Sequence, residues 1–268
     1  MQGLDYTNNT LEKRFINTKN LDILLKNIDP ISLDEMDKVK LMNRTDTKYL
    51  TKIESLYQLL PLLESGYNIL KINNYLINPY KTLYLDTFDS KMYTDHHNGH
   101  KTRKKVRLRT YLNSDTHFLE VKHKNNKGIT KKTRILIPNY EYSTNKDSIY
   151  FLKENIHFEV NELSPHLESL YERITLTNKE KTERLTIDLN LRFKNHRTGN
   201  TNSLEKLIII ELKQDSAKRS HTKELLNNLK IRPTRLSKYC IGSVMTNPDL
   251  KYNRFKPRLI QINKLLQF

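Results

Sequence analysis

The sequence predicts an α+β fold in which antiparallel strands close into a β-barrel. The charged face of the sheet lies inside the barrel, and amphipathic helices pack on its outside. Three observations lead to this prediction. Six segments alternate charged and apolar residues with the two-residue period of a strand. Their charged faces are rich in Arg and Lys and repeatedly carry a carboxylate. Segments with helical spacing lie around them.

The six alternating segments are the basis for the predicted sheet. In 105–111 the basic side chains of Lys105, Arg107 and Arg109 share one face, and 118–124 has a similar charged face. The other segments span 44–49, 132–135, 184–192 and 208–213. The charged residues that share faces are Arg44, Asp46 and Lys48; Glu120, Lys122 and Lys124; Lys132 and Arg134; Arg184, Asp188 and Arg192; and Glu211 and Lys213.

Helical spacing predicts the elements that cover the sheet. Ser32 followed by Glu35 is typical of a capping box that opens a helix. Leucines recur on one side of 53–64, where Pro61 favours a kink and Gly66 an end. Further helices are expected before Pro30 and over 147–155, 220–229, 236–245 and 259–266, and hairpin loops over 125–128 and 196–203. No internal repeat is visible, so we expect a helical lead-in (1–30), one main domain (31–246) and a C-terminal tail or helix (247–268).

A closed barrel competes with a simpler arrangement. For any one strand, an open antiparallel sheet with one buried and one wet face explains the alternation. Taken together, the strands favour the barrel, because 101–134 alone contains twelve Lys or Arg residues and two acidic residues. A basic interior is costly when empty, since like charges repel and lose water. A bound polyanion removes that cost, because Arg binds phosphate oxygens bidentately, and the carboxylates can hold Mg²⁺ or Mn²⁺.

The composition limits the partners and the compartment. The formal net charge is +17, which predicts attraction to nucleic acid, an anionic membrane or a phosphate-rich small molecule. Cys240 is the single cysteine, so no internal disulfide forms, and we expect a small buried residue in a cytoplasmic protein. The N-terminal segment has no apolar core typical of a signal peptide, and the longest apolar run, 207–210, is too short to span a bilayer.

Neither a metal-binding histidine cluster nor a nucleotide-binding loop is predicted. The histidine-rich segment 95–100 fits no standard metal-ligand spacing, and we predict a polar turn that leads into the Arg-rich strand. The glycine-rich loop that cradles nucleotides in many phosphate-binding proteins does not occur in the sequence.

Eight short motifs follow one another along 38–245: RTDTKY (44–49), YLDT (84–87), HNG with RKKVRLRTY (97–111), FLEVKHKNNKGITKKTR (118–134), YER (171–173), ERLTIDLNLRF (183–193), IIELK (209–213) and RLSKYCIG (235–242). In this order they resemble the VTC domain of polyphosphate polymerases, a branch of the triphosphate tunnel metalloenzymes in the CYTH-like superfamily. The resemblance implies an eight-stranded antiparallel tunnel that binds triphosphate with a metal ion at one end. In the polymerases, the γ-phosphate of ATP is transferred to a growing polyphosphate chain.

The resemblance also implies roles for individual residues. Arg107 and Arg109 match the basic pair that grips phosphates, and Lys238 matches the basic residue of the short helix that closes the tunnel. The expected catalytic residues are Arg107, Arg109, Lys122, Arg134, Arg173 and Arg184. The expected phosphate-binding residues are Lys48, Lys124, Lys132, Arg192, Lys213 and Lys238. The expected ligands of Mn²⁺ or Mg²⁺ are Glu211, Glu120 and Asp188, although Asp188 is equally explained as a salt-bridge partner of Arg184 or Arg192.

Two departures from the related enzymes bear on function. CYTH enzymes open with Glu-x-Glu-x-Lys, whereas this sequence has Arg44, Asp46 and Lys48, which favours the VTC branch and removes one usual metal carboxylate. The resemblance does not extend to the SPX module or the transmembrane segments that accompany eukaryotic relatives. The implied partners are ATP or another nucleoside triphosphate, polyphosphate or pyrophosphate, and a membrane protein that moves the product, with no nucleic acid. The alternatives are an inorganic triphosphate or polyphosphate hydrolase, a non-catalytic polyphosphate-binding protein, and a nucleic-acid-binding module.

Overall fold

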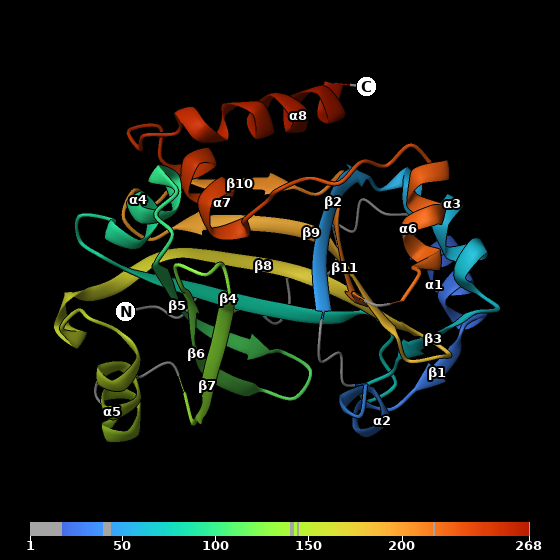
Figure 1. The fold of residues 1–268 in the computed structure, drawn as a ribbon, viewed down its shortest axis with the longest axis horizontal. Helices are drawn as coiled ribbons and strands as arrows, with labels where there is room; N and C mark the ends of the chain where they lie inside the picture. Colours follow the sequence, from blue (N-terminus) through green and yellow to red (C-terminus); the bar gives the residue numbers. More distant parts are fainter. Residues whose placement is uncertain (1–17, 40–43, 140–141, 144, 217, 268) are drawn as a thin grey trace.

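One antiparallel sheet organises the chain. The computed structural model describes residues 18–39, 44–139, 142–143, 145–216 and 218–267. Eight strands form the main path of the sheet in the order β2-β11-β9-β8-β4-β5-β6-β7 (Figure 1). Their bounds are β2 Arg44–Lys52, β4 Asn78–Thr87, β5 Arg103–Tyr111, β6 Thr116–Lys124, β7 Thr130–Ile137, β8 Leu163–Asn178, β9 Glu183–Asn195 and β11 Leu207–Asp215. Three short strands extend the sheet, with β10 (Thr201–Leu204) on β9, β3 (Tyr67–Leu70) on β8 and β1 (Asp29–Ile31) on β3. The predicted α+β class is confirmed.

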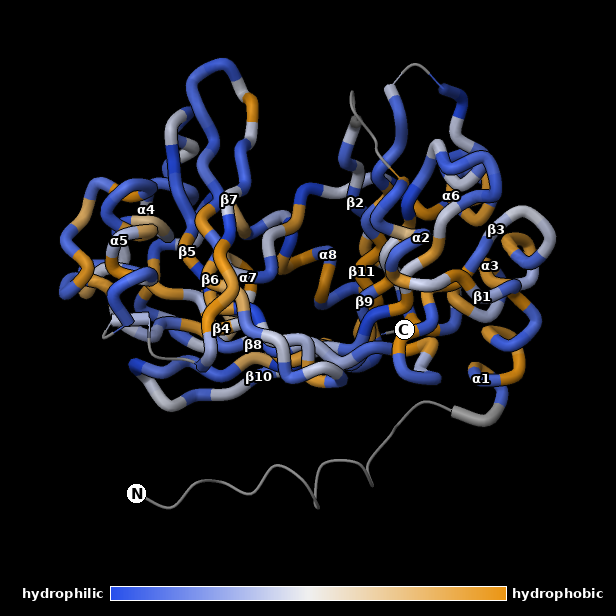
Figure 2. Tube along the Cα trace, turned by 90° about the horizontal axis from the view of Figure 1, so that it is seen from below, coloured by the Kyte–Doolittle hydropathy of each residue, from blue (hydrophilic) through white to orange (hydrophobic). Residues whose placement is uncertain are grey.

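The sheet curves into a trough but does not close, so the predicted closed barrel is not confirmed. Figure 2 shows β5, β6 and β7 rising on one side, β2 and β11 on the other, and β8 between them. Within the described residues, the edge strands β2 and β7 make no backbone pairs with each other. Both edges are cationic, since β2 carries Lys48 and β7 carries Lys131 and Lys132, and charged edge strands resist pairing. The concave side of this sheet is called the trough below.

Two apolar clusters cover the outer face of the sheet. The helices α1 (Thr18–Lys26), α3 (Glu54–Leu63) and α6 (His221–Asn228) pack on β8, β9 and β11, while α5 (Lys146–Asn155) packs beside β4, β5 and β6. The spacing of Leu56, Leu59, Leu60 and Leu63 explains the buried side of α3. The helix contains Pro61, which is exposed. The outer layer thus buries the apolar residues of the alternating strands.

The inner face is apolar only at one end, where α7 (Lys238–Thr246) and α8 (Lys256–Gln267) cover it (Figure 1). Cys240 is completely buried in this contact, as predicted. Gly242 allows α7 to lie close to the sheet, because a Cβ atom there would come within 2.4 Å of the Phe193 ring and 2.7 Å of Leu167. The rest of the inner face is left for polar groups.

The strand β9 changes face at Asn190, a residue with positive φ (51°). Leu189 packs in the outer cluster, whereas Leu191 lies in the inner cluster. The register of β8 also shifts between Leu170 and Glu172 on the neighbouring strand. The prediction of one continuous polar face over 184–192 is therefore wrong, since an extra residue in a strand reverses the side of every residue after it.

Most of the predicted helices are present. The capping box of Ser32 and Glu35 opens α2 (Leu33–Asp37), and α6, α7 and α8 occupy the expected segments. The lead-in helix is present as α1, while residues 1–17 lie outside the described part of the chain. The predicted polar turn over 95–100 is wrong in its first half, because α4 (Lys91–Asn98) continues to Asn98 and ends at the left-handed Gly99. No helix in the ranges that the structure describes is both long and apolar enough to cross a bilayer.

Asp86, in the YLDT motif, joins the sheet to the two helices at the end of the trough. Its buried carboxylate accepts hydrogen bonds from the backbone N–H groups of Thr87 (2.8 Å), Met92 (2.9 Å) and Tyr93 (2.9 Å). It also accepts one from the hydroxyl of Tyr239 on α7. Burial raises the pKa of Asp86, and these hydrogen bonds oppose that rise. One carboxylate therefore holds the first turns of both α4 and α7 against β4.

We expect Asp86→Ala to lower the free energy of unfolding by about 2–4 kcal/mol, because it leaves several buried donors without an acceptor. Urea unfolding followed by circular dichroism measures the change. Asp89→Ala is the matched control, since Asp89 is exposed and accepts only from the Thr87 hydroxyl (2.6 Å). Equal losses in the two variants would contradict the anchoring role.

Candidate functional site

Strand register brings most of the predicted site residues into the trough. On one wall, Lys105, Lys122 and Lys132 lie in one cross-strand row, and Arg107, Glu120 and Arg134 lie in the next. On the other wall, Lys48 lies opposite Glu211, and Lys213 lies between Asp46 and Arg184. Separate strands therefore supply cations to one concave surface.

Glu120 neutralises part of the first wall. Its carboxylate lies between the Nε of Arg107 (2.6 Å) and the Nζ of Lys132 (2.5 Å), and its side chain is 1% exposed. Burial alone would raise the pKa of Glu120, but Arg107, Arg109 and Lys132 outweigh burial and hold the pKa well below its usual range. The carboxylate is thus ionised and has a cation against each of its oxygens.

Asp188 makes the second such group, on β9. Both its oxygens accept from Arg173, at 2.6 Å from Nε and 2.9 Å from the second guanidinium nitrogen, and it also pairs with the ammonium of Lys238. These cations outweigh burial and lower the pKa of Asp188 to about 2. Asp188 therefore forms salt bridges, but its partners are Arg173 and Lys238, so the predicted pairing with Arg184 or Arg192 is wrong.

Two tyrosines join the two charged groups across the floor of the trough. The rings of Tyr80 and Tyr171 stack with centroids 5.4 Å apart. The guanidinium of Arg173 lies 5.1 Å and that of Arg109 5.8 Å from the Tyr80 ring, and the Lys238 ammonium lies 4.3 Å from the Tyr171 ring. Cations from β5, β8 and α7 therefore converge on this pair.

Tyr171 was missed as a site residue. Its hydroxyl is buried and has no hydrogen-bond partner in the described structure. Burial would raise the pKa of this phenol, but Arg109, Arg173 and Lys238 together lower it. In the sequence, Tyr171 looks like any core tyrosine, and only its position beside Arg173 in the YER motif could have indicated the role.

Arg109 differs from its neighbours because it is buried and makes no direct ion pair in the described chain, although its charge acts on Glu120. It is 8% exposed, its Nε makes no hydrogen bond, and it takes part in none of the ion pairs of the described chain. Arg107 and Arg173, by contrast, each bond to a carboxylate. A buried cation without a partner is costly, so this position is suited to an anion from outside the chain.

The carboxylates of the trough do not form one metal site. No group of three or more His, Cys, Asp or Glu side chains suited to a metal lies within the described ranges. Glu120 and Asp188 are each occupied by two cations, and this arrangement does not fit a metal ligand. Glu211 fits better, because its Oε1 contacts only the Lys213 ammonium (2.9 Å), which also lies 3.8 Å from Asp46. Two carboxylates that share one ammonium make a pair able to hold a divalent ion in its place.

The remaining predicted residues lie at the margins of the trough. Arg134 is exposed and lies 4.4 Å from the Phe118 ring. Arg184 donates to the carbonyls of Met36 (2.6 Å) and Val39 (3.4 Å), which ties the wall to the end of α2. Lys122 and Lys124 continue the first wall toward α4, and Lys48 donates to the carbonyl of Leu236 (3.3 Å).

Arg192 is not brought to the trough. It follows the change of face at Asn190, and its Nε pairs with Glu205 at 2.5 Å beside the β10–β11 turn. Lys105, which was not predicted as a site residue, is placed there instead and donates to the Ser237 hydroxyl at the start of α7 (2.9 Å). Burial, Lys48 and Arg103 lower the pKa of Lys105 to about 8.

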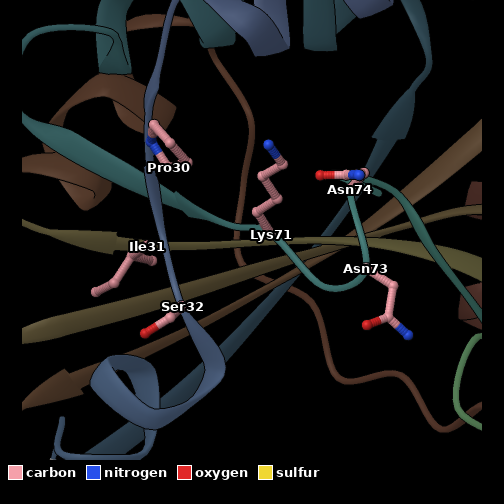
Figure 3. Close-up of a pocket in the computed structure, with 6 residues that line it drawn as sticks. All are labelled: Pro30, Ile31, Ser32, Lys71, Asn73 and Asn74. Atoms are coloured by element: carbon pink, nitrogen blue, oxygen red, sulfur yellow. The ribbon is translucent and has the colours of Figure 1, made fainter.

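A surface pocket lies elsewhere. It has a volume of about 390 Å³ and is formed where the β1–α2 segment meets the connection from β3 to β4 (Figure 3). It is lined by Pro30, Ile31, Ser32, Lys71, Asn73 and Asn74. Lys71 is its one charged lining residue, and none of the predicted site residues takes part. The open trough, rather than this pocket, contains Lys105, Glu120, Tyr171 and Asp188, whose pKa values are shifted.

A concave antiparallel sheet with cations on its floor and walls is the arrangement of the triphosphate-tunnel fold. Residues 43–247 match the family model of the VTC domain. The chain therefore belongs to the VTC domain family, as the sequence motifs had indicated. Among curated proteins, none matches the sequence.

Several solved structures are similar. A putative adenylate cyclase from Vibrio parahaemolyticus is 14% identical and aligns over 75% of this chain and 99% of its own, with a TM-score of 0.45. A putative adenylyl cyclase from Hippeastrum, described as having a dominant triphosphatase activity, is 15% identical over 77% and 97%, with a TM-score of 0.48. A conserved hypothetical protein from Pyrococcus furiosus is 12% identical over 74% and 99%, with a TM-score of 0.42. At TM-scores below 0.5, none of these similarities transfers a function.

We expect Glu120→Gln to destabilise the free protein by about 2–4 kcal/mol, because Arg107 and Lys132 lose their shared counter-ion. Added tripolyphosphate should recover part of that loss by supplying negative charge. Urea unfolding with and without tripolyphosphate measures both effects. Glu205→Gln is the control, because its partner Arg192 lies outside the trough, and there tripolyphosphate should give no extra recovery relative to wild type.

A second prediction concerns pH. Lys105 loses its charge as the pH rises through about 8 in the free protein, so anion affinity should fall above that pH. If Lys105 must take up a proton on binding, the cost is about tenfold in affinity per pH unit. Calorimetric titration at pH 7 and 9 with a linear polyphosphate longer than triphosphate measures the loss. Lys105→Met should show a weaker decline than wild type, and parallel profiles in the two proteins would exclude the role of Lys105.

Proposed function

We propose that this chain binds the triphosphate of ATP in the trough and transfers the γ-phosphoryl group to the end of a polyphosphate chain. Arg109 carries this proposal, because it is a buried guanidinium that makes no direct ion pair with a carboxylate in the described chain. The planar guanidinium can bind two oxygens of one phosphate at once, which a monatomic anion cannot offer. Membership of the VTC domain family supports the same substrate class.

The neighbouring cations would divide the work of holding the phosphates. Arg109, Arg173 and Lys238 converge on the floor around Tyr80 and Tyr171, and we assign them to the reacting phosphoryl group. Phosphoryl transfer depends mainly on in-line positioning and on neutralising oxygen charge. Fixed cations achieve both without moving during the reaction.

The outer cations would hold the rest of the substrate. We assign Arg107, Lys132 and Arg134 on one wall, with Lys48 and Lys213 on the other, to the remaining phosphoryl groups. Arg107 and Lys132 already share Glu120, so their net charge is smaller than that of the floor group. This difference would favour the strongest contacts at the floor.

A divalent cation such as Mn²⁺ or Mg²⁺ is part of the proposal. Glu211, with Asp46 across the same ammonium, would hold it, whereas the ion pairs of Glu120 and Asp188 speak against the ligand role first expected of them. When bound, the ion neutralises phosphate oxygens. Lys213 would then move from the carboxylates toward the substrate.

The product of ATP turnover tests the function. We expect purified protein incubated with ATP and Mn²⁺ to form phosphate chains that are visible on a gel. Orthophosphate without chains would identify a hydrolase on the same scaffold. Neither product, together with no binding of tripolyphosphate, would overturn the enzyme assignment.

Arg109→Ala should remove a bidentate contact and cost about 2–4 kcal/mol of transition-state stabilisation, or roughly 30- to 1000-fold in kcat/KM. Steady-state kinetics with ATP measure the loss. Arg192→Ala is the matched control, because it removes a guanidinium that pairs with Glu205 outside the trough. A near wild-type rate for Arg109→Ala would refute the assignment.

A further inference from the structure

Four cations at the α4 end of the trough have no carboxylate among them. This terminal cation group consists of Arg103, Lys105, Lys122 and Lys124. In the register of β5 and β6, Arg103 lies opposite Lys124 and Lys105 lies opposite Lys122. None of the four forms an ion pair with a carboxylate in the described structure. Like charges directly opposite each other destabilise a sheet, and an anion bound between them removes the repulsion.

The cations along β5, from Arg109 to Arg103, cover a greater length than a triphosphate. Arg109, Lys105 and Arg103 lie on the same face of β5, and the six residue steps from Arg103 to Arg109 span about 20 Å. A P–O–P link is shorter than the two-residue repeat of a strand. A triphosphate held at Arg109 therefore leaves the terminal cation group without an anion.

His96 lies beside this group. It is on the last turn of α4, directly before the loop that enters β5 at Arg103. Burial, Lys105 and Arg103, with further contributions from Lys48 and Lys124, lower the pKa of His96 to about 2. The imidazole is therefore neutral, with one N–H donor and one acceptor nitrogen.

The hydrogen bonds of His96 differ from those of its neighbours. Its Nδ1 is buried and has no hydrogen-bond partner in the described chain, and the nearest ring is that of Phe255, 6.2 Å away between centroids. His97, by contrast, bonds to Asn98 (3.0 Å) and accepts from the backbone of Arg254. His100 pairs with Asp95 and is 52% exposed. Of the three, only His96 has a buried ring nitrogen without a hydrogen-bond partner in the described chain, and Lys105, Arg103 and Lys124 of the terminal cation group act on its charge.

We propose that His96 is a phosphate-binding residue that, with the terminal cation group, holds phosphoryl groups of a linear polyphosphate beyond those that a triphosphate can supply. This inference rests on the proposed function and specifies its substrate, a chain longer than triphosphate. The cations supply attraction, and the neutral imidazole supplies a directed hydrogen bond without adding to the repulsion in the free protein.

Calorimetric titration of the full chain with tripolyphosphate and with a longer linear polyphosphate tests the proposal. Wild-type protein should bind the longer chain more tightly. His96→Ala should weaken binding of the longer chain about tenfold or more and change tripolyphosphate binding by less than about twofold. His96→Asn keeps an amide N–H near the position of Nδ1 and should recover part of the affinity. His100→Gln, a change to the exposed histidine, should match wild type.

The outcomes separate this inference from the proposed function. Equal affinities of His96→Ala and wild type for the longer chain would overturn the role of His96, as would an equal loss for both ligands. Loss of tripolyphosphate binding in Arg109→Ala, with His96→Ala unchanged for both ligands, would keep the proposed function and reject the inference. No tripolyphosphate binding by wild type would reject the proposed function itself. Should His96→Ala not fold, His96→Asn, with the same comparison of ligands, decides the question.

Discussion

Repulsion among cations that the curved sheet turns toward one another is the constraint on which the rest of the structure depends. Glu120 and Asp188 offset it at two points, each by lying between two cations. Both carboxylates are fully committed to this role. The surplus positive charge remains at Arg109 on the floor and toward α4, where an external anion is the remaining means of neutralising it.

The same inner surface must also hold a helix, which requires apolar residues. The change of face at Asn190 meets both needs within β9, because Asp188 lies among the cations while Leu191 packs under α7. Lys238, at the start of α7, reaches back to Asp188, so the apolar end and the charged part of the trough meet at one ion pair. The packing of α7 on the sheet therefore also fixes the position of Lys238, one of the cations on the floor.

Sequence alternation predicted the strands that carry alternating charge and the residues on the first wall, because Arg107 and Glu120 obey the two-residue period. It did not reveal β4 or β8, because β4 presents Tyr80 and β8 presents Tyr171 beside Arg173, and these tyrosines resemble core residues. The position of Arg192 could not be predicted, since one extra residue at Asn190 reverses a face without changing the local pattern. Closure of the sheet and the grouping of the carboxylates depend on contacts between distant strands, which no local period encodes.

Asp86 has a mechanical consequence. Because one carboxylate accepts from the first turn of α4 and from Tyr239 of α7, the two helices that border the trough share a rigid joint. A displacement of either helix is transmitted to the other, and with it the spacing between His96 and Lys238. Asp86 thus sets the spacing between the α4 side and the α7 side of the basic surface, although it contacts neither His96 nor Lys238.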